Sequence, residues 1–274
     1  MAAGRKRPRR GRTRRHTRRC AHRPCGRSFL PAGRGRPQRY CTPACRNAAY
    51  RERGGPKHRR LVRLLQADAR RLLPTLPAGA ADLIVTDPPY VFDRGGTYFR
   101  TWFPELADAE WPAVFRELHR VLASPGHAYV FCDARIKPIF DAAAAGAGFQ
   151  VRIPLIWDKL ALGLGATWRS QYESIAWYAK GPPLARGTDH THVGNVLRAP
   201  RVRGYPAEKP VAILRTLIMQ SSRPGDLVLD PFCGSGNVGR AARRLGRRAL
   251  LADIDPTTAE QRLRVSALRP DIAS

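Results

Sequence analysis

Residues 226–236 read Asp226-Leu-Val-Leu-Asp-Pro-Phe-Cys-Gly-Ser-Gly236, and the fold can be worked out from this stretch. Its apolar start predicts a short strand over 226–230, and its glycines predict a turn that opens a helix running to Leu245. Glycines at such a turn let the backbone approach a nucleotide-like ligand, and an acid at a strand end can hold polar groups. The turn has neither a G-x-G-x-x-G pattern nor a Walker lysine, which disfavours dinucleotide and phosphate binding.

Strands and helices alternate on both sides of this turn. The next strand is predicted at 248–253, where the terminal Asp253 is placed to bind a ribose diol, and a closing helix is predicted from about Pro256. The remaining strands are expected at 81–86, 128–132, 151–157 and 174–179, and the remaining helices at 111–122, 138–145 and 210–219. We expect the first of these helices to stop at Pro125-Gly126. Such alternation is typical of a mostly parallel sheet covered by helices.

A second motif follows the predicted strand 81–86 and reads Asp87-Pro88-Pro89-Tyr90. Two prolines fix the backbone and withhold N–H donors, which leaves carbonyl oxygens as acceptors. Asp87 and the Pro88 carbonyl can accept hydrogen bonds from an amino group, and Tyr90 can stack on a planar ring, so the motif suits a flipped nucleobase. A strand-ending turn with a packed tyrosine would explain either motif alone but does not readily explain both in one chain.

These two motifs together carry a specific resemblance. Residues 87–90 (DPPY) and 230–236 (DPFCGSG) are similar to the catalytic motif and the cofactor loop of the DNA amino-methyltransferases, the S-adenosylmethionine-dependent enzymes that methylate adenine N6 or cytosine N4. The catalytic motif comes first here, which is the order of the family's β group. The similarity covers roughly residues 62–268. It implies a Rossmann-like α/β fold with circularly permuted motifs and a seven-stranded, mostly parallel sheet containing one reversed strand.

The resemblance also implies which residues act. The catalytic motif would be Asp87, Pro88, Pro89 and Tyr90. The cofactor would be bound by residues of the loop and of the blocks 66–68, 205–210 and 247–256, namely Asp68, Lys209, Asp230, Pro231, Phe232, Gly234, Ser235, Gly236, Asn237 and Asp253. The chain departs from the family pattern at Asn237-Val238, where two threonines are usual, at Tyr205-Pro206, where His-Pro is familiar, and at Asp253, where glutamate is commoner.

The residues of the catalytic motif indicate which base is methylated. In the family, D-P-P-Y is commoner among adenine enzymes and S-P-P-Y among cytosine enzymes, so the resemblance favours adenine N6 in double-stranded DNA. Cytosine N4 is the main alternative, and RNA is a second substrate alternative. A different class is a zinc-bearing, non-catalytic DNA-binding protein whose methyltransferase domain has decayed.

The charge of the chain is concentrated near its start. The 274 residues include 49 Lys+Arg and 21 Asp+Glu, a formal net charge of +28. Residues 1–60 hold 21 of those basic residues and the single acid Glu52, which indicates an arm that binds a polyanion such as nucleic acid. No apolar run is long enough for a membrane span, and the N-terminal segment MAAGRKRPRRGRTRR lacks the apolar region of a secretion signal. We therefore expect a cytoplasmic, nucleoid-associated protein encoded by a bacterium or phage.

Four of the six cysteines lie in this arm as two close pairs, Cys20 with Cys25 and Cys41 with Cys45. Two such pairs across a basic loop suit one tetrahedral, structural Zn²⁺, which would stabilise a segment poor in large apolar residues. His22 competes with Cys20 as the fourth ligand. Residues 39–53 (RYCTPACRNAAYRER) also resemble small zinc modules of many bacterial proteins. The alternative is four incidental thiols in a disordered tail.

These expectations give a domain plan and a set of partners. We expect a basic disordered tail over 1–19, a zinc-binding module over 20–53, a linker over 54–60 and a methyltransferase domain over 61–274. The stretch between Lys180 and Tyr205 is short for a target-recognition domain. DNA contacts are therefore expected from residues 158–169, from the loop 91–102 and from the arm. A homodimer and a cognate restriction nuclease are further partners to be considered.

Overall fold

The computed structural model divides the chain into two compact units, Met1–Lys57 and His58–Ser274. The boundary falls inside the range expected to be a linker, 54–60, and the finer division of the arm stays a prediction. The residues that the structure describes are 17–20, 25–29, 41, 61–90, 106–163, 167–182, 193–202, 207–264 and 267–268. Among them, no helix has the length and apolar character needed to cross a bilayer.

In the smaller unit, two short strands form a hairpin. β1 (Arg18–Arg19) and β2 (Ser28–Phe29) pair antiparallel, with Arg18 opposite Phe29. The backbone N–H of Cys20 extends this pairing by donating to the carbonyl of Arg27 at 2.8 Å. The hairpin therefore fixes the position of Cys20 relative to the start of β2.

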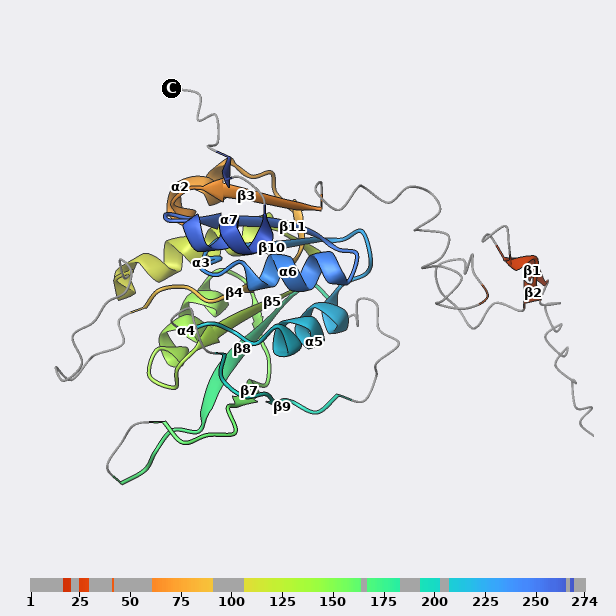
Figure 1. Cartoon of the computed structure of the whole chain (residues 1–274). Coiled ribbons are helices and arrows are strands. Elements are labelled where there is room, and N and C mark those ends of the chain that lie inside the picture. Colours follow the sequence, from red (N-terminus) through yellow and green to blue (C-terminus); the bar gives the residue numbers. More distant parts are fainter. Residues whose placement is uncertain are drawn as a thin grey trace, which may run out of the picture. The chain divides into compact units, whose positions relative to one another are not determined.

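The larger unit is built on a ten-stranded sheet (Figure 1). The strands lie in the order β12-β3-β11-β10-β4-β5-β8-β7-β9, and β6 pairs with β8. Their bounds are β3 Val62–Gln66, β4 Ala81–Thr86, β5 Leu122–Cys132, β6 Gln150–Val151, β7 Leu155–Asp158, β8 Tyr172–Lys180, β9 Val196–Arg198, β10 Leu227–Asp230, β11 Arg248–Asp253 and β12 Ala267–Leu268.

The seven strands from β3 to β7 in this order form the predicted sheet. Neighbours from β3 to β5 pair in parallel, whereas β8 runs antiparallel to both β5 and β7. The prediction of a mostly parallel sheet with one reversed strand is thus confirmed, although the sheet has ten strands where seven were expected. The short strands β6, β9 and β12 extend it.

Helices cover both faces of the sheet, as Figure 1 shows. Side chains of successive strand residues point to opposite faces, so Leu83 and Val85 of β4 pack in one apolar core and Ile84 packs in the other. The first core is closed by α5 (Val211–Ser221), α6 (Asn237–Arg244) and α7 (Thr257–Leu263). The second is closed by α3 (Trp111–Val121) and α4 (Lys137–Gly146), and short α2 (Ala69–Leu72) packs on Leu65. The 3₁₀ turns are η3 (Leu73–Thr75) and η4 (Asp108–Glu110).

Three predicted boundaries were wrong. Helix α3 ends at Val121, and Leu122, which we expected in the helix, begins β5, so this strand starts before the predicted range 128–132. Pro125-Gly126 does not stop the helix but lies within β5, because the pairing with β4 shifts register there and leaves room for extra residues. The strand expected at 151–157 is split into β6 and β7, and Pro154 lies in the gap, where no ladder donor is needed.

The strand order places three acids at one edge of the sheet. β11, β10 and β4 are parallel neighbours, so their carboxyl ends meet at the same edge. β11 ends at Asp253, β10 ends at Asp230, and Asp87 directly follows the end of β4. Motifs that are far apart in the sequence therefore meet at this edge.

Candidate active site

A cavity of about 990 Å³ opens at this edge of the sheet. Every residue that the resemblance assigned to catalysis or to cofactor binding lines it, with the exception of Gly236. Gly236 has a φ of +73°, and a Cβ there would lie 3.1 Å from the Ala259 Cβ and the Leu263 Cδ1. This glycine therefore shapes the turn and lets α6 pack closely against α7.

Asp230 is buried at the end of β10. Its Oδ1 accepts hydrogen bonds from the Thr86 hydroxyl at 2.7 Å and from the Phe232 backbone N–H at 3.2 Å. Burial raises the pKa of Asp230 to about 7, against the opposing effect of these two donors. Thr86, which belongs to no motif recognised in the sequence, thus connects the end of β4 to the end of β10.

Asp253 and Asp68 line the cavity from neighbouring strands. The Asp253 Oδ2 accepts from the Gly234 N–H at 2.8 Å, which ties the glycine turn to the end of β11, and burial raises the pKa of Asp253. Asp68 follows β3 and caps α2 by accepting from the Arg70 N–H at 2.8 Å. The Arg70 side chain also donates to Asp68 and lowers the pKa of that carboxyl.

The DPPY motif forms the wall of the cavity next to β10. The Asp87 carboxylate is 30% exposed and accepts from the Lys209 ammonium. The Pro89 carbonyl accepts from the Leu106 N–H at 3.3 Å. The Tyr90 side chain is 3% exposed, and its ring stands edge-on to that of Phe140, with centroids 5.9 Å apart. Asp87 is therefore the polar side chain of this motif that faces the cavity.

Glu208 is a further acid in the cavity wall that the sequence analysis missed. Its Oε1 accepts from the Asn237 Nδ2 at 2.6 Å and from the Arg262 guanidinium. Its Oε2 is buried and has no hydrogen-bond partner within the described part of the chain. Asn237 also donates to the Lys209 carbonyl at 3.0 Å, so the departure from the family's threonines joins the residues before α5 to the start of α6.

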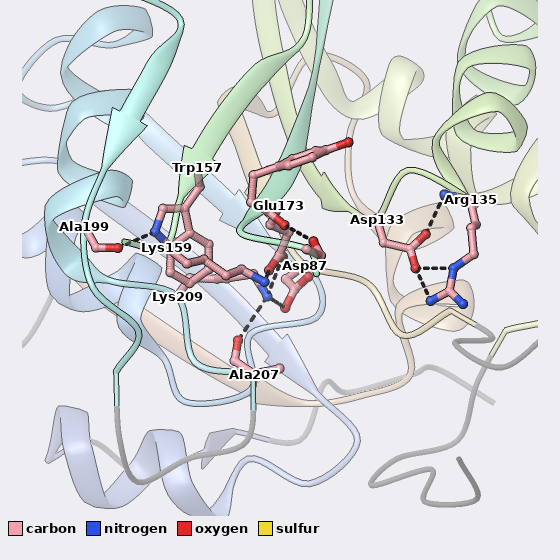
Figure 2. A network of polar contacts seen from close by, with 11 residues as sticks. Asp87, Asp133, Arg135, Trp157, Lys159, Glu173, Ala199, Ala207 and Lys209 are labelled. Atoms are coloured by element: carbon pink, nitrogen blue, oxygen red, sulfur yellow. Dashed lines mark hydrogen bonds and ion pairs between the residues drawn. The ribbon is translucent and has the colours of Figure 1, made fainter. Parts of the chain in front are cut away.

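Lys209 was assigned to the cofactor, but its ammonium lies against Asp87 and Glu173 (Figure 2). Glu173 lies near the start of β8 and also pairs with Lys159, which follows β7. Neither Glu173 nor Lys159 belongs to a motif recognised in the sequence. The available signal was a glutamate directly before the apolar strand expected at 174–179.

The rim of the cavity carries aromatic and basic side chains. The segment between β7 and β8 contributes Trp168, which is 95% exposed, and Arg169, whose Nε donates to the Gly163 carbonyl at 2.7 Å. Arg201 also lines the cavity. This rim includes described residues of the predicted DNA-contacting stretch 158–169, whereas the loop 91–102 lies outside the described residues.

Three predicted metal ligands meet in the smaller unit. The sulfur atoms of Cys20, Cys25 and Cys41 all lie within 4.8 Å of one another. The Cys25 and Cys41 sulfurs are 3.5 Å apart, and the Cys41 N–H donates to the Cys20 sulfur at 3.4 Å. Cys45 and the competing ligand His22 lie outside the described residues.

Comparison with known proteins places the larger unit among DNA methylases. The N6_N4_Mtase family profile, described as DNA methylase, matches residues 81–200 and 186–262. The chain is 30% identical over 251 residues to the DNA adenine methyltransferase YhdJ of Escherichia coli K12, covering 77% of this chain and 83% of that protein. It is 28% identical over 228 residues to the type II methyltransferase M.HpaI of Haemophilus parainfluenzae, covering 70% of each.

A solved structure has the same fold. The crystal structure of TTHA0409 from Thermus thermophilus, a putative DNA modification methylase complexed with S-adenosyl-L-methionine, superposes with a TM-score of 0.60 at 24% identity. The alignment covers 77% of this chain and 99% of that one. The two motifs at one edge of the sheet and the extent of the family match lead to one conclusion. The chain belongs to the N6/N4 family of DNA methylases.

Proposed function

We propose that this DNA methylase transfers a methyl group from S-adenosylmethionine to N6 of an adenine that has been flipped out of double-stranded DNA. The observation that carries the proposal is the meeting of Asp87 with Asp230 and Asp253 in one cavity, at the ends of neighbouring strands. Adenine is supported by the D-P-P-Y sequence of the motif and by the similarity to a DNA adenine methyltransferase.

The residues of the glycine turn fit the proposed cofactor. Asp253 offers a carboxylate for ribose hydroxyls. The buried Oε2 of Glu208, which has no hydrogen-bond partner among the described residues, offers an acceptor for an ammonium group. Phe232, Gly234 and Asn237 complete this side of the cavity. When bound, S-adenosylmethionine supplies an electrophilic methyl group on its sulfonium sulfur. The donor set at this site therefore suits a ligand with a diol and a positive charge.

The base side of the cavity is the DPPY motif. Asp87 and the Pro88 carbonyl would accept hydrogen bonds from the exocyclic amine and so orient its lone pair toward the methyl group, which is chiefly a positioning effect. The amine nitrogen would form the new N–C bond as the S–C bond of the donor breaks with its electron pair remaining on sulfur, and one amine proton would pass to water. The buried ring of Tyr90 would form the wall against which the base rests.

DNA would contact the rim and the basic arm. A tryptophan as exposed as Trp168 is unusual on a protein surface, and here Arg169 and Arg201 line the same cavity. An aromatic side chain can stack on bases, and guanidinium groups can bind phosphates. The net charge of residues 1–60 adds a binding term that depends on salt and not on sequence. Such a substrate agrees with a location in the bacterial cytoplasm.

In the smaller unit we propose a structural Zn²⁺ ion bound by Cys20, Cys25 and Cys41, with Cys45 as the fourth ligand and His22 as the alternative to Cys20. The donor set fits, because three thiols within 4.8 Å of one another can share one tetrahedral ion. The N–H that donates to the Cys20 sulfur would stabilise a thiolate, as outer-shell donors do in metal sites. The ion would hold together a segment whose described residues form only one short pair of strands, each of two residues.

The reaction can be tested on unmethylated DNA with nucleoside mass spectrometry. We expect N6-methyladenosine to appear with the wild-type protein. Asp87→Ala should reduce the rate by about 100-fold or more, because the amine loses its acceptor, while the affinity for S-adenosylmethionine stays unchanged. Glu117→Ala is a matched control, since Glu117 pairs with Arg120 on α3 and does not line the cavity.

Each other outcome has a defined meaning. N4-methylcytosine in place of N6-methyladenosine would make this a cytosine enzyme with the same cavity. Methylated RNA but unmethylated DNA would assign a different nucleic acid. Cofactor and DNA binding without any methyl transfer would contradict the enzymatic proposal and favour a non-catalytic DNA-binding protein. Full activity of Asp87→Ala would remove Asp87 from the mechanism.

A further inference from the structure

Lys209 has no donor left for the cofactor in this structure. A lysine ammonium has three N–H donors. The Lys209 ammonium donates a hydrogen bond to the Asp87 carboxylate and another to the Ala207 carbonyl at 3.0 Å. It lies 3.1 Å from the Glu173 Oε1, with which it forms an ion pair. It also lies 5.3 Å above the ring centroid of Phe131. All of these contacts are on the base side of the cavity, next to the DPPY motif.

Glu173 is in turn held from its other side. Its Oε2 lies 2.9 Å from the Lys159 ammonium, so each of its oxygens faces one lysine. Lys159 lies 5.2 Å above the ring centroid of Trp157, and the Trp157 indole N–H donates to the Ala199 carbonyl at 2.8 Å. Figure 2 shows this row of side chains running from Trp157 through Lys159, Glu173 and Lys209 to Asp87.

The row alternates in charge and becomes more open at Asp87. Two lysines and two acids together carry no net charge, which lowers the cost of burying them. The side chains of Lys209 and Glu173 are 8% and 12% exposed, whereas that of Asp87 is 30% exposed. Asp87 is thus the end of the row that a base in the cavity could reach.

We propose that Lys209, clamped by Glu173, is a positioning residue that holds Asp87 as an ionised hydrogen-bond acceptor facing the target amine. This inference rests on the catalytic role proposed above for Asp87. Glu173 fixes the Lys209 ammonium, and Lys159 balances the charge of Glu173. The lysine that the family resemblance assigned to the cofactor therefore acts on the base side of the reaction.

The electrostatics of the site support the proposal. Burial raises the pKa of Asp87 to about 6, while the charge of Lys209 opposes this rise and that of Glu173 adds to it. Burial disfavours the charge of Lys209, but Asp87 and Glu173 outweigh it and raise the pKa of the lysine. Among the described residues, the charged or titratable groups that face Asp87 are Lys209 before α5, Glu173 on β8, Lys159 after β7, Tyr90 after β4 and Asp230 on β10.

Two variants should move the titration of Asp87 in opposite directions. Lys209→Met removes the positive partner, so the pKa of Asp87 should rise by about 1–3 units. Glu173→Gln removes a nearby negative charge and keeps a hydrogen-bond acceptor, so the pKa of Asp87 should fall. Lys137→Met is the control, because Lys137 pairs with Asp141 at 2.5 Å on α4 and does not line the cavity.

The experiment combines single-turnover methylation rates across a range of pH with carboxyl ¹³C NMR of Asp87 in the full chain. At saturating cofactor, we expect the acid limb of the rate profile to move to higher pH in Lys209→Met and to lower pH in Glu173→Gln. If the pKa of Asp87 rises by one unit in Lys209→Met, the methylation rate on the acid limb should be tenfold lower than in wild type. The rate should recover at higher pH. Cofactor affinity, measured by calorimetry, should stay within about threefold of wild type, which is less than 1 kcal/mol.

Several results would overturn the proposal. Unchanged titration of Asp87 in both charge variants would show that the row does not control it. If Lys209→Met loses affinity for the cofactor while the acid limb does not move, Lys209 binds the cofactor, as the family resemblance implied. If Lys209→Met does not fold, Lys209→Gln replaces it, because glutamine removes the same positive charge and keeps a polar side chain. An acid limb that does not move in Lys209→Gln would also overturn the proposal. NMR reports on Asp87 without turnover, so failure of the proposed methylation would be recognised separately.

Discussion

At the scale of single residues, Asp230 is a carboxyl group in the cavity wall whose charged form is destabilised by burial. Its carboxyl group is buried at the end of β10 and is stabilised by donors from Thr86 and Phe232. These two hydrogen bonds do not offset burial, and its pKa is raised to about 7. Near neutral pH the group therefore exists in both protonation states, and the stability of the native protein depends on pH.

This raised pKa predicts a pH dependence of stability. Between the ordinary value near 3.8 and about 7, the native state binds more protons at Asp230 than the unfolded state. The free energy of unfolding of the cofactor-free protein should therefore fall as the pH rises through this window, by up to about 1.4 kcal/mol per unit from this group.

Urea unfolding at several pH values within that window would measure this slope. Asp230→Asn should flatten it, because the amide does not titrate. Asp87 and Asp253 also have raised pKa values, so part of the slope should remain. An equal slope in the variant and in wild type would contradict the assignment to Asp230.

The sequence predicted part of this site because of where its residues stand along the chain. Asp87, Asp230 and Asp253 each mark the end of a strand, and the edge at which parallel strands end is common to all. Glu173 and Lys209 could not be foreseen together. Their contact depends on the antiparallel placement of β8 beside β5, which no local pattern specifies.

At the scale of elements, local sequence patterns predicted the bounds of an element correctly where burial of an apolar run alone determines them. Strands β4 and β11 were predicted residue for residue, because their apolar runs are bounded by polar or turn residues. The apolar face of α3 was also found, with Trp111 at its start. The end of α3 was not, because pairing with β4 outweighed the turn preference of Pro125-Gly126. Tertiary pairing decided that boundary.

The junction of the glycine turn with α6 gives a prediction at this scale. Gly236→Ala should lower the free energy of unfolding by about 1 kcal/mol or more, because alanine is strained at φ +73° and its Cβ would lie 3.1 Å from atoms of α7. Gly194→Ala is the matched control, since a Cβ at Gly194 meets nothing within 4 Å and its φ is not positive. Denaturant melts of both variants would show the difference, and equal stability would mean that α6 and α7 can move apart at no cost.

At the scale of the whole molecule, the charge and the chemistry belong to different units. Residues 1–60 carry most of the net charge of +28, whereas all residues lining the cavity lie in the unit His58–Ser274. A basic segment can retain DNA without reading its sequence. In the proposed reaction, the cavity would act on the base that the DNA presents.

This division predicts that metal and cofactor binding are separable. Cys41→Ser should lower the zinc content from about one ion per chain, because it removes one of three clustered thiols. Its affinity for S-adenosylmethionine should stay at the wild-type value. Metal analysis by mass spectrometry and calorimetry would measure both, with Cys132→Ala as the control for loss of a buried thiol outside the cluster. Unchanged zinc content in Cys41→Ser would place the ion elsewhere or exclude it.

The position of β4 in the sheet also constrains how the protein is made. β4 lies between β5 and β10, and the hydrogen bond from Thr86 to Asp230 joins residues 144 apart in the chain. On the ribosome, residues 87–90 emerge long before β10 (Leu227–Asp230), so one edge of β4 stays unpaired in the nascent chain until β10 has been synthesised. A chain that terminates before β10 therefore carries residues 87–90 without the neighbouring strand that completes the cavity edge.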